Sequence, residues 1–306
     1  MALGRTTHAP TESGPRVESL AAGLVRGMRP RQWTKNVLVL AAPVAAGEIT
    51  DPEVLWSTAI AFVAFVLASS GVYLFNDASD VEEDRRHPRK RLRPVAQGSV
   101  PVPVAYGASL ALMAAGIGTS LLAGIGLTSV VAVYVVMQVA YCLWLKHQAV
   151  IDIAVVSSGF LLRAIAGGMA AGIELSQWFV LAAVFGSLFI ASGKRYSEAR
   201  LAPTVEGTIR KNLDDYSPSY LRFVWGTAAA TLIMTYGLWA FEIREQTGSI
   251  LAAISMGPFI VAVLRYAVDV DSGNAGEPET IVLNDRLLQV LGLVWVVLLA
   301  GSVYGA

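Results

Sequence analysis

The 306-residue chain is poor in charge. Only 15% of its residues are charged, whereas about 25% are charged in an average soluble protein, and 55% are hydrophobic. So little charge indicates that much of the surface contacts lipid. The 23 basic and 23 acidic residues give a net charge of zero, so the bulk attraction that draws proteins to nucleic acid is absent and no nucleic-acid partner is expected.

Cysteine is nearly absent as well. Cys142 is the only one, which excludes a disulfide within the chain. The first 30 residues also lack the apolar core of a secretory signal peptide, so no cleaved signal is expected there. Residues 1–25 are rich in polar residues and predict a disordered tail, followed by a single membrane domain over 26–306.

Long apolar runs dominate the rest of the chain. A transmembrane helix needs about 20 mainly apolar residues. Nine stretches are candidates: 34–48, 53–75, 102–123, 125–144, 149–172, 177–193, 220–241, 249–268 and 286–304. Because lipid offers the backbone no hydrogen-bonding partners, only helices or closed barrels span a bilayer. The sequence therefore predicts an all-α polytopic membrane protein with nine transmembrane helices.

The basic residues predict the orientation of these helices, because lysine and arginine resist transfer across the membrane. Of the 23, 21 lie in the N-terminal segment or after the second, fourth, sixth and eighth spans. The exceptions are Arg244, in a short loop on the opposite side, and Arg163, inside the fifth span. We expect a multi-pass protein of the cytoplasmic (inner) membrane, with its N-terminus and active site in the cytoplasm.

The clearest chemical signal is an acidic motif at the end of the second span. If the helix continues at 100° per residue, Asn76, Asp77, Asp80 and Asp84 share one face and Glu82 lies opposite. Three carboxylates on one face repel one another unless a cation lies among them, and carboxylate and amide oxygens suit Mg²⁺. The motif predicts a magnesium site, with a solvated acidic helix end as the alternative.

Basic residues next to the motif favour the magnesium site. Acids that bind a metal, followed by bases that bind phosphate, form the two halves of a diphosphate site, and the bases here are Lys90, Arg91 and Arg93. Further polar residues lie at the same ends of the spans: Gln32, Lys35, Tyr141, Lys146, Asp152, Lys194 and Arg195. Each alone fits the usual excess of positive charge on the cytoplasmic side, but together they ring the face that carries the acidic motif.

Arg163 is a separate signal because it lies about 14 residues, or ~21 Å, into the fifth span. A charge at that depth is costly and normally faces a cavity or a partner. Two interpretations stay open. Arg163 either orients the polar head of a lipid substrate or forms a structural pair with an acid such as Glu174 or with a backbone carbonyl.

These residues resemble the UbiA-type membrane prenyltransferase superfamily over nearly the whole chain after residue 25. The pattern Asn76-Asp77-x-x-Asp80-x-x-x-Asp84 at the end of a second span is the most specific element of the likeness. The resemblance implies a nine-transmembrane-helix bundle with a cytoplasmic polar cap, a lipid-facing tunnel and Mg²⁺ as cofactor. It is also compatible with a homo-oligomer such as a trimer.

One difference from the superfamily's pattern indicates which of its members this chain resembles most. Aromatic prenyltransferases of this superfamily carry a second aspartate-rich motif after the sixth span, where this chain has the mostly basic segment 192–200. Such a segment favours an anion over a second Mg²⁺. Together with Arg-Pro-x-Gln-Trp-x-Lys-Asn at 29–36 and the patterns at 141–146 and 159–163, it is similar to the members that transfer phosphoribosyl groups to polyprenyl phosphate for actinobacterial arabinan synthesis.

That resemblance implies a reaction and a role for each group. The donor is 5-phosphoribosyl-1-diphosphate, the acceptor is decaprenyl or another polyprenyl phosphate, and pyrophosphate leaves. The leaving group is expected to contact Lys90, Arg91, Arg93 and Lys35, the 5-phosphate to contact Lys194 and Arg195, and the acceptor head to contact Tyr141, Lys146 and Arg163. The expected catalytic residues are Asp77, Asp80, Asp84 and Asp152, of which Asp152 stabilises positive charge on the ribose.

Two other functions remain open from the sequence. A UbiA-type enzyme that moves a prenyl group from prenyl diphosphate to an aromatic acceptor would use the same acidic helix, although the basic second segment argues against it. A transporter or channel would use Arg163 to line a solute path. The absence of paired repeats among the nine spans argues against transport.

Overall fold

The computed structural model describes residues 19–201, 216–273, 281–282 and 284–305. All regular elements in these ranges are helices, which confirms the predicted all-α class. Residues 1–18 of the predicted tail, and Arg210 and Lys211 among the basic residues, lie outside the described ranges. The tail prediction overlaps a helix, because α1 (Leu20–Gly27) begins with Ser19 accepting a hydrogen bond from the backbone of Ala22.

Eight helical segments of the described chain are long and apolar enough to cross a membrane. They are α3 (Pro52–Ser79), α5 with η3 (Val102–Ser120 and Leu121–Ala123), α6 (Ile125–Leu143), α7 (Ile151–Ala171), α8 (Gln177–Leu201), α9 (Pro218–Thr247), α10 with α11 (Leu251–Ile254 and Met256–Asp271), and α13 (Arg286–Tyr304). The chain is thus a multi-pass membrane protein.

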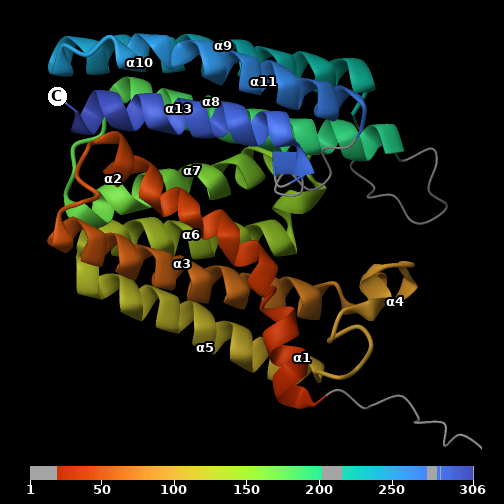
Figure 1. The fold of residues 1–306 in the computed structure, drawn as a ribbon. Coiled ribbons are helices and arrows are strands. Elements are labelled where there is room, and N and C mark those ends of the chain that lie inside the picture. The colour runs from red at the N-terminus through yellow and green to blue at the C-terminus, as the bar shows by residue number, and fades with distance from the viewer. Residues whose placement is uncertain (1–18, 202–215, 274–280, 283, 306) are drawn as a thin grey trace, which may run out of the picture.

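The first predicted span, 34–48, is not confirmed as a transmembrane α-helix. Residues Pro30–Leu40 form a 3₁₀-helix, η1, and Ala41–Ala45 form the short helix α2. A 3₁₀-helix rises about 2.0 Å per residue and an α-helix about 1.5 Å, so η1 and α2 together extend about 30 Å. They cross the bundle in contact with α7 and, through η1, with α3 (Figure 1).

Local sequence signals fix where the long helices begin and end. The side chain of Asp51 accepts a hydrogen bond from the backbone of Glu53 at 2.7 Å and caps α3, and Pro52 follows at the first helical position, where its missing N–H costs nothing. Ser217 caps α9 in the same way, at 3.1 Å from the backbone nitrogen of Tyr220. Gly172 ends α7 with a left-handed φ of 71°, which glycine adopts without strain.

The two largest hydrophobic clusters of the described residues fill most of the bundle, and α7 contributes to both. One gathers around α3, α6 and α7 and includes Phe65, Leu127 and Ala166. The other gathers around α8, α9 and α11 and includes Phe189. The carbonyl of Val39 in η1 lies so close to Gly167 in α7 that any side chain there would collide with it. Small residues thus allow the backbones to pack closely, as is common between membrane helices.

The alternating direction of the helices gathers the polar residues at one end of the bundle. The helices α3, α6, α8 and α11 end there, and α5, α7, α9 and α13 begin there (Figure 1). The acidic motif, the turn between α6 and α7, and the basic end of α8 consequently lie at the same end. Every site residue predicted from the sequence except Arg163 and those in η1 belongs to this end.

Candidate active site

The acidic motif begins on the last turn of α3 and continues into the short helix α4 (Val81–Arg86). Asp80 interrupts the helix between them, with φ −99° and ψ 12°. Two of the acids still meet at a common partner, because Arg93 Nη1 lies 3.2 Å from Asp77 Oδ1 and 2.7 Å from Asp84 Oδ2. The break at Asp80 therefore leaves Asp77 and Asp84 turned toward the same basic side chain.

Asp77 is, like Asp84, an enclosed acid of the motif, with 1% of its surface exposed. Its Oδ1 accepts a hydrogen bond from Arg29 as well as the contact from Arg93. Its Oδ2 is buried and has no hydrogen-bond partner among the described residues. A buried carboxylate oxygen without a partner is costly, so this atom is suited to a cation or a donor supplied by a ligand.

The two other polar members of the motif contact α6 and the turn that follows it. Lys146 forms an ion pair with Asp80. The thiol of Cys142 donates to Asn76 Oδ1 at 3.5 Å. The end of α3 is thus held against the segment that joins α6 to α7.

The pKa of Asp84 shows the balance of forces on these acids. Burial raises its pKa because the charged form loses water, and the nearby Arg93 opposes that rise. The described residues contain no ready-made group of three or more His, Cys, Asp or Glu side chains spaced to hold a metal. The acids are instead paired with basic side chains, and the ligand set Asn76, Asp77, Asp80 and Asp84 stays a prediction.

The remaining predicted phosphate ligands lie at the rim of this site or in η1. Lys90 belongs to the 3₁₀-helix η2 (Lys90–Leu92), where its charge acts on both Asp84 and His87. Burial, followed by the charge of Lys90, lowers the pKa of His87. Arg91 is exposed next to Lys90. In η1, Gln32 is half-buried and Lys35 Nζ lies 6.0 Å from the centre of the Phe160 ring.

A second polar cluster joins α6, α7 and α8. Arg195 donates from Nε to Asp152 Oδ2 at 2.8 Å, from Nη1 to Glu198 Oε2 at 2.6 Å and from Nη2 to the hydroxyl of Tyr141 at 3.1 Å. Each nitrogen of this guanidinium thus has a protein partner. Lys194 is more exposed and lies 3.9 Å from Glu198, which makes it the more accessible of the two basic residues predicted to bind phosphate.

Tyr216 completes this cluster from the segment before α9. Its hydroxyl donates to Asp152 Oδ1 at 2.5 Å and accepts the backbone N–H of Val150. Tyr216 was not predicted from the sequence, and Glu198 was placed at this face but given no role. Glu198 at i+3 from Arg195 was a readable signal, whereas Tyr216 lies 64 residues from Asp152 and no local pattern indicates their contact.

Arg163 is buried in α7 about 12 residues, or ~18 Å, from the start of the helix. It donates to Asn36 Oδ1 at 2.7 Å, to the carbonyl of Gly159 at 2.6 Å and to the hydroxyl of Tyr134 at 2.9 Å. The contact with a backbone carbonyl is one that the sequence left open. No acid, Glu174 included, pairs with Arg163 among the described residues, so its charge is held by neutral groups.

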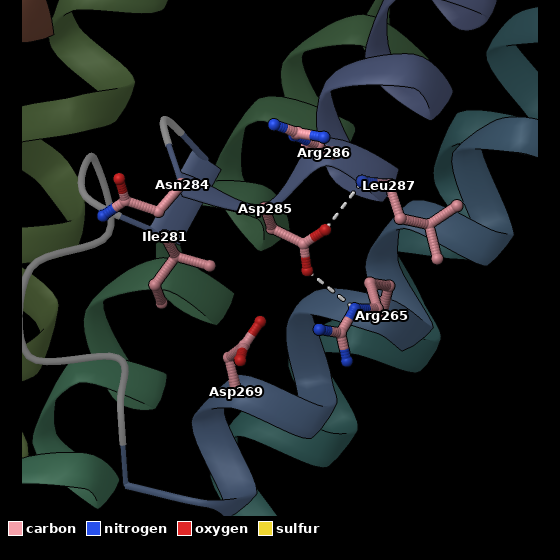
Figure 2. A pocket seen from close by; sticks show the side chains of 7 residues that line it. All are labelled: Arg265, Asp269, Ile281, Asn284, Asp285, Arg286 and Leu287. Carbon is pink, nitrogen blue, oxygen red and sulfur yellow. Dashed lines mark hydrogen bonds and ion pairs between the residues drawn. The ribbon is translucent and has the colours of Figure 1, made fainter.

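A separate hollow of about 490 Å³ lies at the same end, between α11 and α13 (Figure 2). Asp285 caps α13 there by accepting the backbone N–H groups of Leu287 and Leu288, at 2.8 and 3.1 Å, and it also accepts Arg265 Nε at 2.7 Å. These hydrogen bonds, that from Leu288 first, lower the pKa of Asp285. None of the predicted catalytic or binding residues lines this hollow.

Comparison with known proteins identifies the class to which this fold and site belong. The chain belongs to the UbiA prenyltransferase family, which matches residues 37–284. A UbiA homologue from Archaeoglobus fulgidus, solved with dimethylallyl diphosphate (DMAPP) and Mg²⁺, superposes with a TM-score of 0.72 over 93% of this chain and all of that one. At 16% identity, this likeness shows the fold alone.

Relatives of known activity are much more similar in sequence. The chain is 53% identical over 293 residues to the decaprenyl-phosphate phosphoribosyltransferase of Corynebacterium glutamicum, covering 94% of this chain and 88% of that protein. It is 49% identical over 314 residues to the enzyme of that name from Mycolicibacterium smegmatis, covering 97% and 98%. The predicted family and the predicted transferase class are therefore confirmed.

Proposed function

We propose that this enzyme transfers the 5-phosphoribosyl group of 5-phosphoribosyl-1-diphosphate to decaprenyl phosphate, or a related polyprenyl phosphate, and releases pyrophosphate. Identity of about 50% over almost the whole chain to decaprenyl-phosphate phosphoribosyltransferases carries the proposal. The basic end of α8, where Lys194 and Arg195 replace an acidic motif, supports it. The product would serve the synthesis of cell-wall arabinan.

The acidic motif is proposed to bind the diphosphate of the donor together with Mg²⁺. The oxygens of Asn76, Asp77, Asp80 and Asp84 are of the type that Mg²⁺ prefers, and the unpartnered Oδ2 of Asp77 fits a cation. When bound, the ion would neutralise charge on the leaving pyrophosphate.

Basic side chains beside the acids are proposed to contact the same diphosphate. Arg93 bridges Asp77 and Asp84, so it lies beside the acids that would hold the diphosphate through Mg²⁺. Arginine binds phosphate oxygens with a fork of two N–H groups, whereas lysine offers a point charge. Arg29 is added to the predicted set because it contacts Asp77 directly. The other proposed contacts are Lys90, Arg91, Lys35 and Gln32.

The acceptor is proposed to approach from the bilayer toward Tyr141 and Lys146, with Arg163 deeper along α7. A phosphate oxygen is already anionic near neutral pH, so its attack on C1 of the ribose needs no general base. Positive charge would grow on the ribose, and Asp152 is proposed to stabilise it. A carboxylate beside the ribose would attract that positive charge.

The end of the bundle that carries the site is proposed to face the cytoplasm across the inner membrane. The distribution of basic residues supports this orientation, because most lie at that end. A polar cap there would contain the donor site, and the apolar helices would hold the acceptor's tail. A homo-oligomer such as a trimer is proposed from the family resemblance.

Replacing Lys194 with glutamine is expected to raise the KM for 5-phosphoribosyl-1-diphosphate about tenfold, because a charged hydrogen bond to phosphate is lost. The KM for the polyprenyl phosphate should change little. Arg200→Gln is the matched control, since Arg200 lies six residues farther along α8 and contacts Asp271. An unchanged donor KM in Lys194→Gln would show that the 5-phosphate does not bind to Lys194.

Replacing Arg163 with leucine is expected to raise the KM for polyprenyl phosphate about tenfold or more, and to affect the donor less. The change removes a buried positive charge and leaves Asn36 Oδ1 and the Tyr134 hydroxyl without their donor. Arg163→Lys keeps the charge but not the three hydrogen bonds. Steady-state titration of short and long polyprenyl phosphates measures the effect, and equal losses for donor and acceptor would contradict the assignment.

The proposed reaction is tested by isotope transfer with the purified enzyme in lipid nanodiscs. With donor labelled in the ribose, decaprenyl phosphate and Mg²⁺, label is expected in the organic-soluble lipid and pyrophosphate in the aqueous phase. The second candidate, prenyl transfer to an aromatic acceptor, is favoured only by family membership. Label from prenyl diphosphate in an aromatic product, with none passing from ribose to lipid, would establish that activity and reject the proposal.

A further inference from the structure

We propose that Tyr216 is a positioning residue, whose hydroxyl holds the turn between α6 and α7 so that Lys146 stays at Asp80. The inference rests on the proposed function, because it assigns Tyr216 to the reaction of that site. That the Tyr216 hydroxyl fixes the turn rests on contacts between described residues alone.

The Tyr216 hydroxyl makes two hydrogen bonds of opposite direction. It accepts the backbone N–H of Val150 and donates its own proton to Asp152 Oδ1 at 2.5 Å. Both partners belong to the beginning of α7, while Tyr216 lies just before α9. Burial, followed by the hydrogen bond to Asp152, raises the pKa of the Tyr216 hydroxyl, so it stays protonated and keeps donating at neutral pH.

The backbone held by this hydroxyl is strained. Val150 has φ 71° and ψ −47°, close to the rare classic γ-turn, and a β-branched side chain disfavours positive φ strongly. Among the described residues only Arg29 and Val150 adopt positive φ without being glycine. Such a conformation persists only where its surroundings enforce it, and the Tyr216 hydroxyl is the side-chain group that binds the Val150 amide.

The strained turn carries the lysine that contacts the acidic motif. Lys146 lies in the 3₁₀-helix η4 (Leu145–His147), four residues before Val150, and pairs with Asp80. If the backbone at Val150 relaxed to negative φ, the direction of the chain between η4 and α7 would change. Lys146 would then move relative to Asp80.

Tyr216 connects the helices α8, α9 and α11 to the turn between α6 and α7. Its ring is buried in the hydrophobic cluster of α8, α9 and α11 and stacks on Tyr220, with centroids 5.8 Å apart and planes at 10°. Asp80 and Lys146 belong to the segments at the ends of α3 and α6. The two hydrogen bonds of Tyr216 therefore fix one part of the active site relative to the other.

Tyr216→Phe tests the inference because it keeps the ring and its stacking and removes both hydrogen bonds. We expect the KM for polyprenyl phosphate to rise about tenfold and the donor KM to change less than about twofold, since Lys146 is the proposed acceptor contact. Tyr220→Phe is the matched control: it removes a hydroxyl from the stacked neighbour and should leave both constants unchanged. Acceptor constants equal to those of the unaltered enzyme in Tyr216→Phe would overturn the inference.

A second substitution separates the hold on the turn from the bond to Asp152. Glycine adopts positive φ without strain, so Val150→Gly added to Tyr216→Phe should restore most of the acceptor affinity without restoring the hydrogen bond to Asp152. Val150→Gly alone serves as the reference of this double-mutant cycle. A double variant as impaired as Tyr216→Phe would show that the effect passes through Asp152 and would overturn the inference.

Hydrogen exchange supplies a readout that is independent of the reaction. Deuterium uptake over residues 144–152 should increase in Tyr216→Phe, because the Val150 amide loses its acceptor, and should stay unchanged in Tyr220→Phe. Unchanged uptake in Tyr216→Phe would contradict the claim that the Tyr216 hydroxyl fixes the turn. If the unaltered enzyme transferred no phosphoribosyl group while uptake changed as expected, the proposed function alone would fail.

Discussion

The variant Asp77→Asn is expected to lose at least about a hundredfold in kcat/KM for 5-phosphoribosyl-1-diphosphate, while the protein still inserts in the membrane. Asparagine has nearly the shape of aspartate but lacks its charge, so both the proposed metal ligand and the partner of Arg29 and Arg93 are weakened. Removing one electrostatic contact to a developing charge costs about 10²–10³ in rate in other enzymes. Steady-state turnover of the purified variant in nanodiscs measures the loss.

Glu82→Gln is the matched control for this variant. Glu82 lies in the same acidic segment, but it is exposed, and among the described residues it pairs only with Arg85 at the surface. An exposed ion pair of this kind contributes about 0–1 kcal/mol, so the change should affect neither stability nor turnover noticeably. Near-normal turnover in Asp77→Asn, or equal losses in Asp77→Asn and Glu82→Gln, would reject the role given to Asp77.

Removal of divalent metal is the second prediction with a large effect. Dialysis of the enzyme against EDTA should reduce phosphoribosyl transfer to background, and readdition of Mg²⁺ should restore it. The physical reason is that diphosphate and the acids of the motif are both anionic and repel each other unless a cation lies between them. Recovery in the same preparation shows that EDTA removed the ion without unfolding the protein. Full turnover in EDTA would contradict the magnesium site.

Much of the fold could be predicted from the sequence because the bilayer restricts the choice of structure. Each apolar run of sufficient length had to be a helix or a barrel strand, and eight of the nine predicted spans coincide with helices of the described chain that are long and apolar enough to cross a membrane. The stretch 34–48 differs because its helix is largely 3₁₀, with Pro30 at its start. Hydropathy indicates that such a segment is apolar, but it does not distinguish a 3₁₀-helix from an α-helix.

The candidate site was predictable in its residue types and less so in its contacts. The acids of the motif lie within nine residues, so their proximity was expected, whereas the break at Asp80 and the bridge through Arg93 were not predicted. The side-chain partners of Arg163 could not be found in this way, because Asn36 lies 127 residues away and Tyr134 lies 29 residues away. Arg195 was predicted to bind phosphate, and the sequence could not show that Asp152, 43 residues away, already holds its Nε.

Calorimetry of donor binding tests the central claim most directly, namely that the acidic motif binds the donor's diphosphate through a divalent ion. The account predicts that 5-phosphoribosyl-1-diphosphate binds the unaltered enzyme with Mg²⁺ present, binds at least about tenfold more weakly in EDTA, and gains little from Mg²⁺ in Asp77→Asn. Glu82→Gln should behave like the unaltered enzyme. Equal affinity with and without Mg²⁺, or a full Mg²⁺ effect in Asp77→Asn, would contradict the claim.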